Sequence, residues 1–126
     1  MLRWKLFRSK WLVLGWFLMM CVLFFLPGSD LPQGHWLDDI HIDKLVHVGL
    51  FAVLIFLWLS AFPSTVNYYV LWVLFAALIY GLAVEFIQRT WVPNRSFDLF
   101  DVAADFLGAI VGWMVFREVY KKNKPL

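Results

Sequence analysis

The sequence predicts an all-α membrane protein, a bundle of four transmembrane helices with both termini in the cytoplasm. The chain of 126 residues is 63% hydrophobic and only 16% charged, whereas about a quarter of the residues in a soluble domain are charged. Its apolar residues gather in four long stretches, at residues 11–26, 45–62, 68–87 and 99–116. A chain of this size cannot hide so much apolar surface from water in one core, so we expect lipid to solvate much of it.

The length suits a single membrane domain, residues 1–126, with outer connections at residues 27–44 and 88–98. The chain has one cysteine, Cys21. An intrachain disulfide and a cysteine-based zinc motif are therefore excluded.

The first apolar stretch follows four basic residues and ends before Pro27 and Gly28, which terminate a helix. A basic start and an apolar run of this length are also typical of a secretory signal. No Ala-x-Ala cleavage pattern follows, however, and Trp11 and Trp16 are large for a signal peptide. We predict an uncleaved signal-anchor helix.

The second and third stretches are separated by Pro63 and the very short turn at residues 64–67. Short turns join antiparallel neighbours, so we expect these two helices to form a hairpin. The third helix should end near Gln88, and the fourth should begin near Asp98.

The distribution of charge predicts the orientation. Eight of the 11 Lys and Arg residues lie in the two terminal tails, and eight of the nine acidic residues lie towards the opposite side. An excess of Lys and Arg marks the cytoplasmic side. We expect a multi-pass protein of the bacterial cytoplasmic (inner) membrane, with the basic tails against anionic lipid and no nucleic-acid partner.

Each of the last three helices has ionisable residues near its outer end. In the second helix, Asp43 and His47 share a face, and His47 lies one turn inside the apolar run. In the third helix, Glu85 follows an apolar stretch and has Gln88 three residues later. Asp43 also suits a helix N-terminus, and Glu85 suits an ion pair with Arg89. Ionisable groups inside spans are nevertheless functional candidates by default.

The start of the fourth helix carries a stripe of acids. Asp98, Asp101 and Asp105 are spaced i, i+3, i+7, which places them on one face. Helix capping explains Asp98 and partly Asp101, but not Asp105, which lies two turns inside. Arg95 is the nearest cation.

We therefore predict one polar, outward-facing ligand site, formed by Asp43, Lys44, His47, Glu85, Gln88, Arg95, Asp98, Asp101 and Asp105. By ligand type, the candidates for holding a divalent metal are His47, Glu85, Asp98 and Asp101. The candidate catalytic residues are His47, Glu85 and Asp101. The sequence has no HExxH, GxSxG or phosphate-loop motif, and it identifies no cofactor.

These residues resemble the VanZ-like family of small bacterial membrane proteins. The resemblance covers about residues 42–116 and rests on Asp43-Lys44…His47…Phe51, Glu85-x-x-Gln88, Arg95-x-x-Asp98-x-x-Asp101 and Gly108-x-x-x-Gly112. The family usually has Asn where this chain has Asp105. The resemblance implies a role in the cell envelope, since the name-giving member is linked to glycopeptide (teicoplanin) resistance.

Three functions stay open at this point. The site binds a cell-envelope or glycopeptide-type ligand, or it belongs to a metal-dependent hydrolase or transferase acting on an envelope lipid, or it is part of a proton or ion transporter. Few polar residues continue from the site towards the cytoplasmic half, which counts against a pore.

Overall fold

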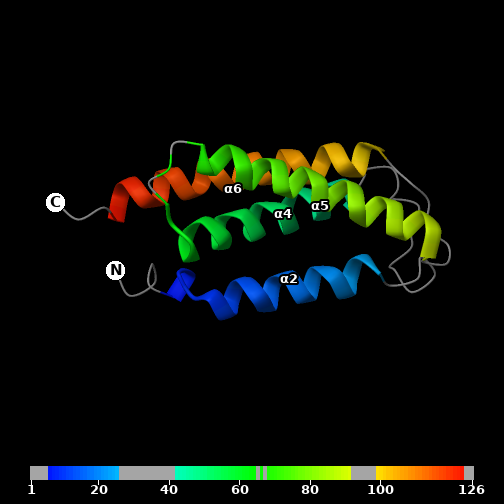
Figure 1. Ribbon diagram of the computed structural model, residues 1–126, viewed down its shortest axis with the longest axis horizontal. Helices are drawn as coiled ribbons and strands as arrows, with labels where there is room; N and C mark the ends of the chain where they lie inside the picture. The colour runs from blue at the N-terminus through cyan, green and yellow to red at the C-terminus, as the bar shows by residue number, and fades with distance from the viewer. Residues whose placement is uncertain (1–5, 26–41, 65, 67, 92–98, 124–126) are drawn as a thin grey trace.

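The computed structural model describes residues 6–25, 42–64, 66, 68–91 and 99–123. Its long helices are α2 (Lys10–Phe24), α4 (Ile42–Ala61), α5 (Tyr69–Trp91) and α6 (Leu99–Asn123) (Figure 1). No strand occurs in the described ranges. The predicted all-α fold with four long helices is confirmed.

Three of the helices are long and apolar enough to cross a membrane. The qualifying segments are Lys44–Ala61, Tyr69–Trp91 and Leu99–Lys122, whereas α2 is apolar but shorter. Large apolar side chains also cover the outside of the bundle, among them Leu71 on α5 and Phe100 on α6. An apolar exterior of this kind suits contact with lipid rather than water. The orientation of the termini stays a prediction.

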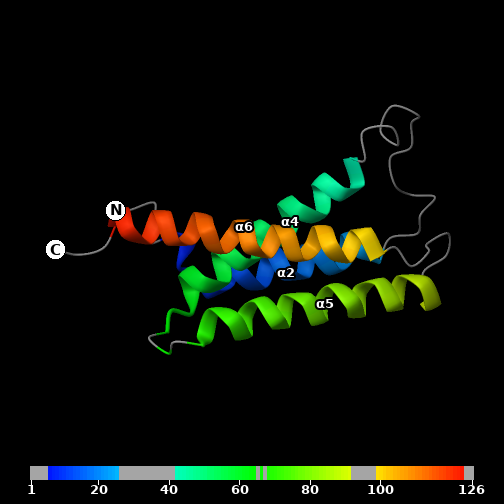
Figure 2. The same cartoon turned by 90° about the horizontal axis from the view of Figure 1, so that it is seen from above.

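The helix α6 lies in the middle of the packing. It packs closely against α4, which crosses it obliquely, and along its other side against α5 (Figure 2). The helix α2 packs mainly against α4. Although α4 and α5 are joined by a short connection, they touch each other little. The expected hairpin of α4 and α5 is therefore not closely packed. Both helices have α6 as their main partner.

Two glycines explain why α6 is the preferred partner of α4. A Cβ atom at Gly108 would collide with the carbonyl oxygen of Val48, and one at Gly112 with the carbonyl oxygen of Ala52. Small residues four apart let two helix backbones approach each other, which strengthens packing between apolar helices in a membrane. The predicted Gly-x-x-x-Gly face is thus the contact surface for α4.

The core between the helices is apolar, and Met20, Phe51 and Ala109 are completely buried in it. At one end of the bundle the core is polar instead of apolar. The start of α4, the end of α5 and the start of α6 lie at this end (Figures 1 and 2). The buried polar side chains His47, Glu85, Gln88 and Asp105 come from these segments.

Candidate functional site

Three ionisable side chains from three different helices meet inside this end of the bundle. His47 of α4, Glu85 of α5 and Asp101 of α6 each offer one metal-ligating atom, and these atoms lie within 4.8 Å of one another. Glu85 is 0% exposed and His47 is 6% exposed. The structure thus brings together residues that lie far apart in the sequence, with His47 and Glu85 buried and Asp101 partly exposed.

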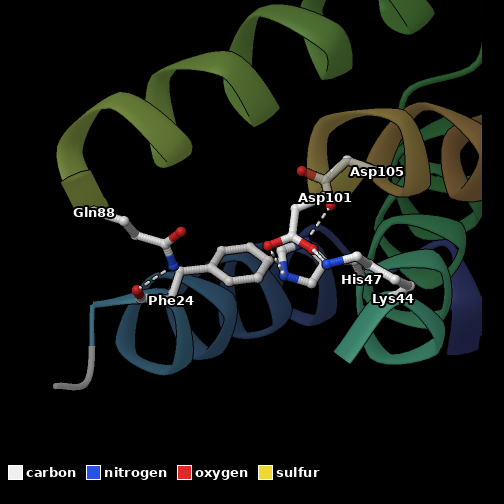
Figure 3. A network of polar contacts seen from close by, with 6 residues as sticks. All are labelled: Phe24, Lys44, His47, Gln88, Asp101 and Asp105. Carbon is white, nitrogen blue, oxygen red and sulfur yellow. Dashed lines mark hydrogen bonds and ion pairs between the residues drawn. The ribbon is translucent and has the colours of Figure 1, made fainter. Parts of the chain in front are cut away.

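His47 is oriented by a fourth residue, Asp105 (Figure 3). The Nδ1 atom of His47 lies 2.6 Å from Oδ1 of Asp105, and its Nε2 atom lies 3.7 Å from Oδ2 of Asp101. With the Asp105 carboxylate ionised, Nδ1 is the donor in this hydrogen bond, because an ionised carboxylate only accepts. A neutral imidazole then has its lone pair on Nε2, the nitrogen on the side of Asp101.

Lys44 lies at the edge of the site and forms an ion pair with Asp101. Its Nζ atom is 2.7 Å from Oδ1 of Asp101 (Figure 3). Both side chains are partly exposed, unlike His47 and Glu85. Lys44 therefore contributes a positive charge at the edge of the polar cluster.

Gly81 makes room for the Asp105 carboxylate, a role that the sequence analysis missed. Asp105 is 0% exposed, and a Cβ atom at Gly81 would lie 2.9 Å from its Oδ2 atom. Among the described residues, this oxygen has no hydrogen-bond partner. A small residue one helical turn before Glu85 is a signal that could have pointed to this close approach.

The helix α2 covers the site from one side through Phe24. The Phe24 ring stacks on the His47 ring, with 5.1 Å between centroids. The buried side chain of Gln88, a residue of the predicted ligand site, donates a 2.6 Å hydrogen bond from Nε2 to the carbonyl oxygen of Phe24 (Figure 3). Gln88 therefore links α5 to the end of α2. No feature of the sequence marks Phe24 as a neighbour of His47.

Three of the predicted site residues cannot be placed. Arg95 and Asp98 lie outside the described residues, and so does the side chain of Asp43. The metal-ligand candidates that the structure brings together are therefore His47, Glu85 and Asp101, with Asp105 behind His47.

The sequence model of the VanZ/LLP1 family matches residues 5–120, most of the chain. This match confirms the resemblance that the polar motifs carry. No curated protein and no solved structure shows a significant match.

Proposed function

We propose a metal-dependent function for this chain, which belongs to the VanZ/LLP1 family. His47, Glu85 and Asp101 bind a divalent cation between α4, α5 and α6, and an envelope lipid is hydrolysed or transferred there. The observation that supports this proposal most directly is the position of three ligand atoms, one from each helix, within 4.8 Å of one another.

The chemistry of the donors suits a catalytic cation. One imidazole and two carboxylates are ligands that Zn²⁺ and Mn²⁺ accept. Three protein ligands leave a coordination position for water or for a substrate oxygen, as in catalytic zinc sites. Behind His47, the Asp105 carboxylate matches the partner that metal-ligating histidines usually have at their second nitrogen.

The chain's own residues have separate tasks in this proposal. Asp105 holds the His47 ring so that Nε2 faces the other ligands. Lys44, at the edge of the site, attracts an anionic head group. Phe24 keeps water from the His47 ring by stacking on it. A bound divalent cation would supply polarisation of the substrate oxygen or activation of a water molecule.

Binding of a cell-envelope or glycopeptide-type ligand, with a link to teicoplanin resistance, is the second candidate. The partly exposed Lys44–Asp101 pair favours it, because this pair offers both charges at the edge of the bundle. A large ligand would however meet little more than this edge, since His47, Glu85 and Asp105 are buried. A small occupant, such as a cation, fits these buried residues better.

Proton or ion transport has less support from the interior of the bundle. Towards the opposite end, the buried residues of α4 include Leu54, Leu57 and Leu59. Among the described residues of that half, the buried polar side chain is Ser60. Its hydroxyl already donates a 2.7 Å hydrogen bond to the carbonyl oxygen of Phe56. The described residues of that half therefore do not extend the polar site into a path across the bundle.

The test is direct metal binding by the purified protein in lipid nanodiscs. We expect the parent protein to bind Mn²⁺, followed by electron paramagnetic resonance, and Zn²⁺ to compete for the same site. Glu85→Gln and Asp101→Asn should fold and accumulate normally but lose this binding, because each keeps the shape of the side chain and removes its charge.

Glu118→Gln is the matched control. Glu118 lies on α6 and its side chain is 59% exposed, so its replacement should leave Mn²⁺ binding unchanged. A parent protein that binds no divalent cation, or a Glu85→Gln variant that binds as well as the parent, would contradict the proposal.

A further inference from the structure

We propose that the apolar cavity between α2, α4 and α5 holds a hydrocarbon chain of a membrane lipid. Resting on the proposed function, we further infer that this lipid is the substrate, whose head group lies at the polar site. The chemical class of the ligand is thus an amphiphile with a long chain and an anionic head.

The cavity is large enough for such a chain and is lined by apolar groups. Its volume is about 370 Å³, and its walls include Phe17 of α2, Leu54 and Trp58 of α4, and Ala76, Ala77 and Tyr80 of α5. Ligand pockets in proteins usually measure about 300–1,000 Å³. The two alanines create the hollow, because they present only methyl groups between the larger side chains.

The polar atoms along its walls are already engaged with protein groups. The Tyr69 hydroxyl donates to the carbonyl oxygen of Phe62 at 2.5 Å, and the Trp58 indole donates to Tyr69 at 3.1 Å. The Tyr80 hydroxyl lies 3.5 Å from Sγ of Cys21. Water needs two to four polar partners to be stable in a cavity, so these walls favour an apolar occupant.

The position of the cavity in the bundle makes a lipid chain the available apolar occupant. The lining residues of α4 and α5 fall within the candidate spans Lys44–Ala61 and Tyr69–Trp91. At that depth the surrounding solvent is hydrocarbon.

The cavity wall and the polar site are neighbours along α5. Tyr80 belongs to the cavity wall, and the next residue, Gly81, is the one that makes room for Asp105. Ala77 and Glu85 are eight positions apart on the same helix, which corresponds to about 12 Å at 1.5 Å per residue. A lipid chain in the cavity therefore places its polar end within reach of the site.

The test uses nanodiscs doped with two forms of phosphatidylglycerol, one with a photoreactive group in the acyl chain and one with it in the head group. Adducts are mapped by mass spectrometry. We expect the acyl probe to label cavity residues of α4 and α5 above other lipid-facing residues. The head-group probe should label the peptides that contain Lys44 or Asp101.

Two alanines of α5 provide a matched pair of variants. Ala76 and Ala83 are both exposed, but only Ala76 is in the cavity wall. Ala76→Phe should reduce acyl labelling of the cavity several-fold, to the level of other lipid-facing surfaces, whereas Ala83→Phe should leave it unchanged. Uniform labelling of all lipid-facing helices, no difference between the variants, or adducts joining two copies of the chain would overturn the cavity assignment.

Metal binding separates this inference from the proposed function. Ala76→Phe should bind Mn²⁺ like the parent, because it lies outside the ligand cluster. Cavity labelling in a protein that binds no Mn²⁺ would support the chain site and refute the metal-dependent function. Head-group labelling that persists in Ala76→Phe would refute the link between the two sites.

Discussion

His47 is held from several directions, and this restraint matters more than its burial. Asp105 bonds Nδ1, Asp101 lies near Nε2, and Phe24 covers the ring face. These contacts determine both the orientation of the ring and the nitrogen that carries the proton. Because the orientation of the His47 ring is already fixed, the ring would not have to lose further conformational freedom on binding a metal ion.

Replacement of Asp105 by Asn, the residue that the family resemblance implies at this position, tests this restraint. The Asn side chain still accepts the hydrogen bond from Nδ1 but removes one charge. We therefore expect Asp105→Asn to be the mildest of the buried acid replacements, weakening Mn²⁺ affinity by about 10-fold. Asp101→Asn should abolish binding in the same titration. An Asp105→Asn variant that loses all binding would mean that Asp105 is itself a ligand.

A second residue to test is Gly81. Its Cβ atom would lie 2.9 Å from the Asp105 carboxylate, so Gly81→Ala should push Asp105 away from His47 and weaken Mn²⁺ binding. Gly15→Ala is the control, because a Cβ atom there meets nothing within 4 Å. That change should raise stability by up to about 1 kcal/mol, the usual gain from Gly to Ala in a helix. Equal Mn²⁺ affinity in both variants would refute the role of Gly81.

The sequence predicted that polar side chains of the last three helices lie close together, because helix ends can be located from the sequence. His47, Glu85 and Asp101 lie near ends that an alternating topology brings to one side, so their convergence followed from the spans alone. Phe24 and Gly81 were missed because their roles arise from contacts between helices. Such contacts depend on how each helix is rotated, which a single sequence does not reveal.

The helix α2 is attached to the bundle by a few specific polar contacts. Gln88 donates to the carbonyl oxygen of Phe24, and the Trp16 indole donates to the carbonyl oxygen of Leu50 at 3.0 Å. We expect Gln88→Leu to weaken this attachment by about 0.5–1.5 kcal/mol, the usual contribution of one hydrogen bond. Mn²⁺ binding should be retained, in contrast to Glu85→Gln.

Cys21 provides a built-in probe for this prediction, since it is the only cysteine in the chain and contacts Tyr80. Its reaction with a membrane-permeant maleimide should be faster in Gln88→Leu than in the parent. Thr90→Ala, at an exposed position on the same helix, is the control and should react at the parental rate. An unchanged rate in Gln88→Leu would show that apolar packing alone holds α2.

Helix pairing was harder to predict than the helices themselves. The four apolar stretches correspond to α2, α4, α5 and α6, because continuous hydrophobicity identifies a span whatever its neighbours are. The expected hairpin of α4 and α5 relied on the short turn. The close contacts of Gly108 with Val48 and of Gly112 with Ala52 favour α6 instead.

The orientation of the whole molecule can be tested with reporter fusions. The basic tails predict a cytoplasmic C-terminus, so a fusion after Arg117 should report the cytoplasm. Fusions at Gly34 and Asn94, in the connections that precede α4 and α6 in the sequence, should report the outer side. The control is a fusion in the short connection after Pro63, which should again report the cytoplasm. A cytoplasmic signal at Gly34 would reverse the proposed outward-facing site.

The short α2 has a consequence for the surrounding bilayer. Its 15 residues span about 22 Å at 1.5 Å per residue, less than the roughly 30 Å of a hydrocarbon core. A segment this short is accommodated by local thinning of the membrane or by snorkelling of flanking residues such as Lys10. We expect lipid phosphates to sit deeper beside α2 than elsewhere around the bundle.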